Sequence, residues 1–216
     1  AEALVRGIDE NGRIIAPDHF IGELEKSGEI RDLDLYVLNR ALFLMDQWRE
    51  EGIEPIRISV NFSRVTLFHA TTLASILAVQ SRYPRLPAGL LELEITESAG
   101  NIEKAALTDV MEQLRRHGII FSLDDFGSQY ANISIFTNVR FDVVKLDRSM
   151  ISGLAENSIS QMLVRDIVHI GETCGIDCVA EGVETSEQRA ALLEAGCLYA
   201  QGYYYDRPMP AEQFKA

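Results

Sequence analysis

Acidic and amide side chains recur where the predicted β-strands of this chain end. Residues 90–96 alternate between apolar and polar types, so Glu92, Glu94 and Thr96 share one face of a strand. The other members of the pattern are Ser59 and Asn61, Asp124 and Asp125, Lys145 and Asp147, Glu181 and Glu184, and Gln201. Carboxylates on an inner strand face are unfavourable unless they meet a cation. Any one of these groups could be a cap or a turn, but their recurrence indicates a shared polar site.

The donor types of this pattern select the kind of metal. Carboxylate and carboxamide oxygens suit Mg²⁺, Mn²⁺ or Ca²⁺ rather than Zn²⁺. The adjacent Asp124 and Asp125 could serve two cations, which together would clamp a phosphoryl group and generate hydroxide. We interpret the histidines as surface or packing residues and the cysteines, odd in number, as buried thiols of a reducing cytoplasm. These residues are His19, His69, His117 and His169, and Cys174, Cys178 and Cys197.

Helices and strands alternate along the chain, and glycines follow most of the helices. Helices are predicted at residues 17–27, 35–52, 71–83, 107–118, 159–174 and 185–196, and strands at 2–5, 56–62, 90–96, 119–123, 142–146, 177–181 and 198–202. In the helix at 159–174, one predicted face carries Ile159, Leu163, Ile167, Ile170 and Cys174. Thr185 and Gln188 have the spacing of a capping box. The pattern predicts one α/β domain over residues 1–216, with parallel strands whose carboxyl ends meet at one rim, as in a barrel.

Composition narrows the class of partner. The 216 residues carry a net charge of −13, which repels duplex nucleic acid and anionic lipid, so we expect no binding to duplexes and no membrane contact from this domain. The apolar runs are too short to span a membrane and no signal segment opens the chain, which favours a cytoplasmic domain, although the full protein could be membrane-anchored. Bound metal ions would reconcile the acidic rim with a phosphate substrate.

Seven sequence blocks, in order, resemble the signature of the EAL domain, a family of bacterial phosphodiesterases that linearise cyclic di-GMP to pGpG. The blocks are Glu2-Ala3-Leu4, Val60-Asn61-Phe62-Ser63, Glu94-Ile95-Thr96-Glu97-Ser98, Asp124-Asp125-Phe126-Gly127, Lys145-Leu146-Asp147-Arg148-Ser149, Ala180-Glu181-Gly182-Val183-Glu184-Thr185 and Gln201-Gly202-Tyr203. The similarity runs from Glu2 to Pro210. It implies a modified (β/α)8 TIM-like barrel with one antiparallel strand.

The resemblance also implies roles for residues in these blocks. Glu2, Asn61, Glu94 and Asp124 would bind one metal, and Asp124, Asp125 and Glu181 a second. Lys145 would orient the attacking water, Glu181 would be the general base, and Glu184 and Gln201 would support the metal waters. The implied cofactor-binding residues are Arg6, Gln201, Asp147 and Glu97, the last as an anchor of the loop after Asp125. We expect Mg²⁺ or Mn²⁺ as the cofactor, one or two ions per site, with Ca²⁺ inhibitory.

The chain departs from the family pattern in two places. Residues 128–132 read Ser-Gln-Tyr-Ala-Asn where the family usually has Thr-Gly-Tyr-Ser-Ser, and Gly7 stands where the family has Trp after Arg6. The first replacement is expected to alter loop geometry, metal affinity and dimer coupling, because Gln129 occupies a glycine position. The resemblance also implies a first strand that precedes the Glu2 block. We expect this strand to be missing from this chain and to lie upstream in the natural polypeptide.

Several functions remain compatible with the sequence. The leading hypothesis is an active cyclic di-GMP phosphodiesterase with cyclic di-GMP as its partner. The alternatives are a catalytically silent cyclic di-GMP receptor, a signalling scaffold that binds no nucleotide, and a barrel hydrolase for another phosphodiester. The resemblance further implies a homodimer and fusion to sensor or GGDEF-type cyclase domains in the full protein.

Overall fold

The computed structural model describes residues 1–96, 104–128 and 139–214. Contacts divide these residues into two compact units. The first comprises Ala1–Glu94, Ala105–Ile120 and Pro210–Ala216, and the second comprises Ile95–Lys104 and Phe121–Met209. In the described part of the chain, no helix combines the length and apolar character that a membrane span requires.

The first unit contains three strands that pair in parallel. They are β1 (Glu2–Ala3), β4 (Ile58–Asn61) and β5 (Leu91–Thr96), the last belonging to this unit as far as Glu94. Glu2 lies opposite Ser59, and Asn61 lies opposite Glu94. The strands predicted at residues 2–5, 56–62 and 90–96 are therefore confirmed, with slightly shorter bounds. The register brings the polar strand ends of this unit together.

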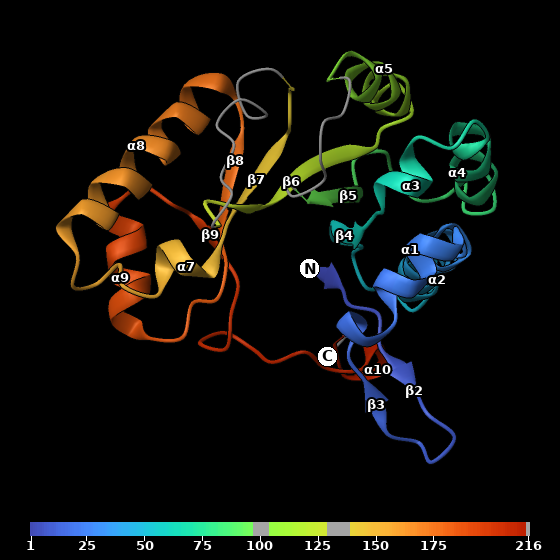
Figure 1. Cartoon of the computed structure of the whole chain (residues 1–216), viewed down its shortest axis with the longest axis horizontal. Helices are drawn as coiled ribbons and strands as arrows, with labels where there is room; N and C mark the ends of the chain where they lie inside the picture. Colours follow the sequence, from blue (N-terminus) through green and yellow to red (C-terminus); the bar gives the residue numbers. More distant parts are fainter. Residues whose placement is uncertain (97–103, 129–138, 215–216) are drawn as a thin grey trace. The chain divides into compact units, whose positions relative to one another are not determined.

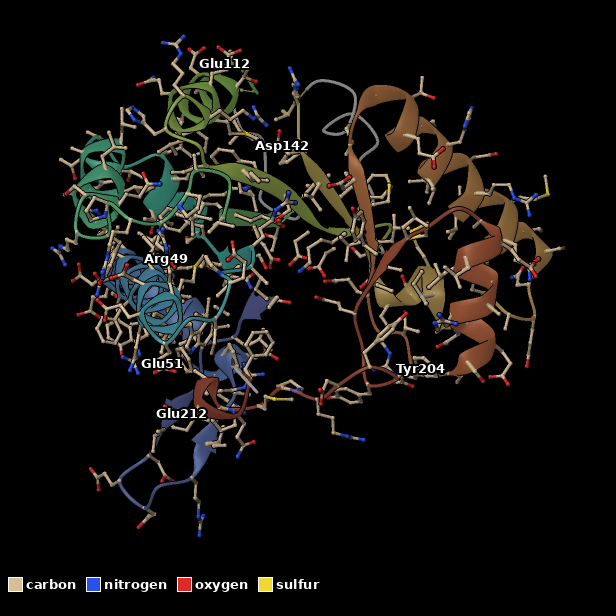
Figure 2. All side chains as sticks on the ribbon, turned by 180° about the vertical axis from the view of Figure 1, so that it is seen from behind. Arg49, Glu51, Glu112, Asp142, Tyr204 and Glu212 are labelled. Atoms are coloured by element: carbon tan, nitrogen blue, oxygen red, sulfur yellow. The ribbon has the colours of Figure 1, made fainter. Side chains whose placement is uncertain are left out.

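Helices of the first unit pack around the long α2 (Ile30–Glu50), which buries Ile30, Leu38, Leu42 and Met45 on one face. The 3₁₀ helix η1 (Pro17–His19) and α1 (Ile21–Ser27) precede it, and Gly28 ends α1 with φ of 81°. The remaining helices are α3 (Arg64–Leu67), α4 (Thr72–Gln80), α5 (Lys104–Arg115) and α10 (Ala211–Phe214). Figure 2 labels Arg49 and Glu51 at the carboxyl end of α2.

A short hairpin in the first unit was not predicted. Strands β2 (Gly7–Ile8) and β3 (Ile14–Ile15) pair in antiparallel fashion, and Figure 1 shows them as the two blue arrows joined by a loop. Two-residue strands are too short to show an alternating pattern, so the sequence carries little signal for them.

The second unit contains four parallel strands in sequence order. They are β6 (Ile120–Phe126), assigned to this unit from Phe121 onward, β7 (Val143–Leu146), β8 (Asp177–Ala180) and β9 (Tyr199–Ala200). Asp142, labelled in Figure 2, precedes β7, and its Oδ2 accepts a hydrogen bond from the Phe121 N–H at 2.9 Å. The helices are α7 (Arg148–Ile151), α8 (Ser158–Cys174) and α9 (Ser186–Glu194).

Helix α8 buries a different face from the predicted one. Its buried residues are Val164, Ile167, Val168 and Gly171, whereas Ile159, Leu163, Ile170 and Cys174 are exposed. Gly171 explains why this face is buried. A Cβ at this position would lie only 2.8 Å from both the Ile176 oxygen and the Cys178 sulfur, so a residue with a side chain could not pack so closely. Only the glycine face allows such close approach. The predicted stripe is therefore present, but apart from Ile167 it is not the buried face of the helix. The expectation of a buried thiol at Cys174 was wrong.

The capping box before α9 is confirmed. The Thr185 Oγ1 accepts a hydrogen bond from the Gln188 N–H at 3.2 Å, and the Gln188 Oε1 accepts from the Thr185 N–H at 3.1 Å. The same Oε1 accepts from the Glu184 N–H at 2.8 Å. These bonds anchor the carboxyl side of the segment that follows β8, which carries Glu181.

Candidate metal and catalytic site

Three carboxylates converge in the second unit. Asp124 and Asp125 on β6 and Glu181 just after β8 each offer an oxygen, and these oxygens all lie within 4.8 Å of one another. The Asp124 side chain is 13% exposed, and Asp125 is exposed. All three belong to the predicted second metal set, so the structure brings that set together.

The convergence of two adjacent aspartates requires a break in strand geometry, because successive side chains of a regular strand point to opposite faces. The register between β6 and β7 shifts between Leu123 and Phe126, and Asp125 has a φ of 56°. A bulge of this kind re-aims side chains, and aspartate tolerates the left-handed region better than most residues. The sequence prediction ended this strand at residue 123, but the structure continues it through the bulge to Phe126.

Lys145 supplies the cation of this cluster. Its Nζ lies 2.7 Å from the Glu181 Oε1 and 3.3 Å from the Asp124 Oδ1, and its side chain is 4% exposed. A buried lysine with these contacts is a structural counter-charge that limits repulsion among the carboxylates. Gln201 adds a second donor to the same glutamate, with its Nε2 2.6 Å from the Glu181 Oε1.

Arg148 contacts the segment after Glu181 at two residues, Gly182 and Glu184. Gly182 has a φ of 67°, and a Cβ there would lie 2.6 Å from Cγ of Arg148. The same arginine pairs with Glu184, whose Oε1 lies 2.9 Å from the Arg148 Nη2. Glu184 is thus held by Arg148 and lies outside the three-carboxylate cluster, while its predicted support of metal waters stays a prediction. Sequence reasoning gave no role to Arg148, although it lies within the Lys145 block.

Asp147 caps a helix. Its Oδ1 accepts a hydrogen bond from the Ser149 N–H at 3.0 Å at the start of α7. Its backbone N–H donates to the Phe126 oxygen at 2.9 Å, which ties this residue to the end of β6. The capping role accounts for the position of Asp147, and nucleotide contact by this residue remains a prediction.

The first unit holds the rest of the predicted metal set. The Asn61 Nδ2 donates a hydrogen bond to the Glu2 Oε1 at 2.9 Å, and Glu94, level with Asn61 on the next strand, is buried. Arg6 is exposed, and its Nη1 lies 2.7 Å from the Val5 oxygen. Glu97 and residues 129–132 of the atypical loop lie outside the described residues.

The donor set of the second unit fits a hard divalent cation. The cluster offers carboxylate oxygens at mutual distances that one or two ions could bridge, and its members include no thiol or imidazole. Within the described residues, the predicted histidines and cysteines take no part in this cluster. Such an arrangement can bind Mg²⁺ or Mn²⁺ and present it to a phosphate group.

The sequence matches the EAL domain family over residues 1–208, and the chain therefore belongs to that family. It is 35% identical over 215 residues to the bifunctional diguanylate cyclase/cyclic di-GMP phosphodiesterase MucR of Pseudomonas aeruginosa, covering 100% of this chain and 31% of MucR. It is 34% identical over 213 residues to the cyclic di-GMP phosphodiesterase NbdA of the same organism, covering 97% of this chain and 27% of NbdA. The chain thus spans less than a third of the length of these relatives.

A solved structure supports the fold class. The PaMucR phosphodiesterase in complex with c-di-GMP matches with a TM-score of 0.88 at 35% identity, over 99% of this chain and 86% of that chain. The predicted α/β class with a TIM-barrel-like EAL fold is confirmed by this likeness.

Proposed function

We propose that this chain hydrolyses cyclic di-GMP to linear pGpG in a metal-dependent reaction. The observation that carries the proposal is the cluster of Asp124, Asp125 and Glu181 around the buried Lys145. The names of MucR and NbdA support the substrate, since both are called cyclic di-GMP phosphodiesterases.

The residues that would hold the metal in the second unit are Asp124, Asp125 and Glu181. Bound Mg²⁺ or Mn²⁺, one or two ions, would offset the charge of the phosphodiester and lower the pKa of water. Glu2, Asn61 and Glu94 of the first unit remain expected ligands on the strength of the family resemblance. Ca²⁺ should bind and inhibit, because its looser coordination positions water less well.

The chain's own residues accept the proton of the attacking water and orient the groups that react. In the proposed step, the water oxygen forms a bond to phosphorus and the bond from phosphorus to the 3′-oxygen breaks, which leaves pGpG with a 5′-phosphate. We assign Glu181 as the acceptor of the water proton, and the leaving 3′-oxygen takes a proton from solvent. Lys145 and Gln201 both contact the Glu181 Oε1, so they fix its orientation, and Lys145 also orients the water. We assign Glu184, which is held by Arg148, to the support of the metal-bound waters.

Product formation tests this function directly. Cyclic di-GMP is incubated with the protein in Mg²⁺ or Mn²⁺, in Ca²⁺ and in excess chelator, and pGpG is quantified by chromatography, with Glu181→Gln as the inactive control. The expected result is turnover that chelation or Ca²⁺ abolishes. Calorimetry in Ca²⁺ separates the alternatives: nucleotide binding without product would indicate a receptor, and no binding would indicate a scaffold. Full turnover in metal-free protein would contradict the mechanism.

We also propose that the domain forms a homodimer through helix α8. The exposed side chains Ile159, Met162, Leu163 and Ile170 form an apolar stripe along one side of this helix. Light scattering after gel filtration should show a dimer for the natural protein and a monomer for Leu163→Glu. Arg165→Glu, a charge change on another side of α8, is the matched control and should stay dimeric. A dimeric Leu163→Glu would contradict the assignment.

The length of the relatives supports a longer natural polypeptide. MucR and NbdA are more than three times as long as the matched region, and MucR is named as a cyclase as well as a phosphodiesterase. We propose that this domain works in the cytoplasm, within a protein that also carries sensor or GGDEF-type domains.

A further inference from the structure

A buried carboxylate on α2 lies outside every role assigned so far. Asp34 occupies the apolar stripe of α2 between Ile30 and Leu38 and is 6% exposed. A leucine at this place would continue the stripe, so the acid needs an explanation from its contacts.

The contacts of Asp34 lead to the end of strand β4. Its Oδ2 accepts a hydrogen bond from the Ser63 backbone N–H at 3.0 Å and another from the Thr66 Oγ1 at 2.5 Å. Thr66 is fully buried, and its backbone oxygen accepts in turn from the Thr72 hydroxyl at the start of α4. One carboxylate therefore ties α2 to the β4–α3 turn and, through Thr66, to α4.

The Ser63 N–H is the donor that matters for the strand end. The Phe62 N–H still donates to the Glu94 oxygen at 3.0 Å, as a ladder bond would. The next N–H turns away from the strands to Asp34, and Ser63 then caps α3 with its Oγ accepting from the Val65 N–H. β4 ends at Asn61, so hydrogen bonds from two consecutive backbone N–H groups fix the backbone directly after this residue.

We propose that Asp34 is a positioning residue for the Asn61 carboxamide, acting through the Ser63 N–H. By fixing the turn after β4, it holds Asn61 where its Nδ2 reaches Glu2 and its oxygen can serve a metal ion. The inference rests on the proposed function, in which Asn61 is a metal ligand. Burial raises the pKa of Asp34 to about 6, although the hydrogen bonds from Thr66 and Ser63 act in the opposite direction. The side chain is therefore held away from water while its oxygen accepts these hydrogen bonds.

The test separates positioning from packing. Asp34→Ala removes the acceptor of the Ser63 N–H, whereas Thr66→Val removes only the other hydrogen bond and keeps the side-chain shape. Mn²⁺ affinity is measured by electron paramagnetic resonance, hydrogen exchange of the Ser63 amide by NMR, and kcat and KM for cyclic di-GMP by product formation. All measurements are made well below the Tm of each variant.

Asp34→Ala should weaken Mn²⁺ binding by at least about tenfold, as loss of a group that orients a ligand does, and should speed exchange of the Ser63 amide. Thr66→Val should lower the Tm but change the Mn²⁺ affinity less than about twofold. Asp34→Asn retains an acceptor oxygen and should restore most of the affinity. Equal shifts in Asp34→Ala and Thr66→Val, or none in Asp34→Ala, would overturn the proposal.

A second pair of variants covers the case in which Asp34→Ala does not fold. Ser63→Pro deletes the same N–H at a φ of −64°, which proline adopts, and Ser63→Ala keeps the N–H while losing the hydroxyl cap. Only the proline variant should weaken Mn²⁺ binding; equal affinities in the pair would contradict the inference. If the natural protein binds Mn²⁺ but forms no pGpG, the proposed function fails, while the affinity and exchange data still decide the role of Asp34.

Discussion

The two units balance the negative charge of their polar strand ends differently. In the second unit, the buried Lys145 contacts both Asp124 and Glu181, so the cluster contains its own cation. In the first unit, Glu2 accepts from the neutral carboxamide of Asn61, and the cation that pairs with Glu92, at 3.7 Å, is the more exposed Arg57. A cluster with an internal counter-charge can form before any metal arrives, and it binds the metal with its groups already oriented. Under the proposed function, we therefore expect substitutions in the second-unit cluster to affect turnover most, and substitution of Asn61 to affect mainly the metal requirement.

The largest expected effect comes from Asp124→Asn. This change removes one charge from the cluster but leaves Lys145 in place, so both metal affinity and turnover should fall, the latter by at least about 10³-fold. Mn²⁺ calorimetry and pGpG chromatography measure the two losses. Asp109→Asn makes the same chemical change on the exposed side of α5 and should have no effect. Turnover near the natural value in Asp124→Asn would remove the second unit from the mechanism.

Lys145→Met should lower turnover by at least about 10²-fold, because Glu181 loses one of its two donors and the attacking water loses the group proposed to orient it. It should also reduce the free energy of unfolding by about 3 kcal/mol without metal, since the partly buried carboxylates lose their counter-charge. A divalent cation can replace that charge, so Mg²⁺ should raise the Tm of the variant more than that of the natural protein. Differential scanning calorimetry measures both shifts.

The control for this experiment is Lys26→Met, which removes an exposed lysine that pairs with Glu23. Its Tm and its response to Mg²⁺ should match those of the natural protein. An equal Mg²⁺ response in Lys145→Met would show that the lysine does not act as the internal counter-charge.

Asn61→Ala probes the first unit and should have a smaller effect. The Mg²⁺ concentration for half-maximal turnover should rise about tenfold, while turnover at saturating Mg²⁺ falls only a few-fold, because the second cluster is intact. Activity titrations with Mg²⁺ measure both quantities. A loss of turnover as large as that of Asp124→Asn would mean that the two units contribute equally to catalysis.

Asp34→Asn should have the smallest effect on turnover at neutral pH, yet it should change how stability depends on pH. Burial raises the pKa of Asp34 to about 6 from 3.8, so the folded state favours the protonated acid. The natural protein should lose about 3 kcal/mol of unfolding free energy from this group as pH rises from about 4 to above 6. The asparagine variant lacks this loss. Urea denaturation across that range should show the unfolding free energy of Asp34→Asn rising relative to that of the natural protein as pH increases. A difference between the two proteins that does not change with pH would contradict the raised pKa of Asp34.

The sequence predicted the order of the longer helices and strands and the carboxylates of the second-unit cluster, because both depend on local patterns. Alternating residues located the strands, glycines located the helix ends, and Thr185 with Gln188 marked a cap that the structure contains. The carboxylates of the second cluster were found because strand ends of a parallel sheet gather at one edge. A local sequence pattern could not predict the bulge at Asp124 and Asp125, because the bulge depends on the register between β6 and β7.

Two further features depended on tertiary contacts. The buried face of α8 is selected by the close approach of Gly171 to the following strand, while the helix sequence alone offered more than one apolar face. Asp34 was overlooked, although the sequence pattern indicated it. An acidic residue within the apolar stripe of α2 means either that the predicted buried face of the helix is wrong or that the acid has a buried hydrogen-bonding partner. The structure supplies that partner in the turn after β4.

The left-handed backbone of Asp125 restricts which amino acids this position can accept, and it separates the demands of folding from those of catalysis. With φ at 56°, glycine and asparagine keep the backbone but forfeit a negative ligand, whereas glutamate keeps the charge but adds a side chain that this conformation disfavours. Aspartate alone satisfies both demands. A library of substitutions at this codon, sorted once for stable protein and once for activity, should return two different sets of survivors that share a single member.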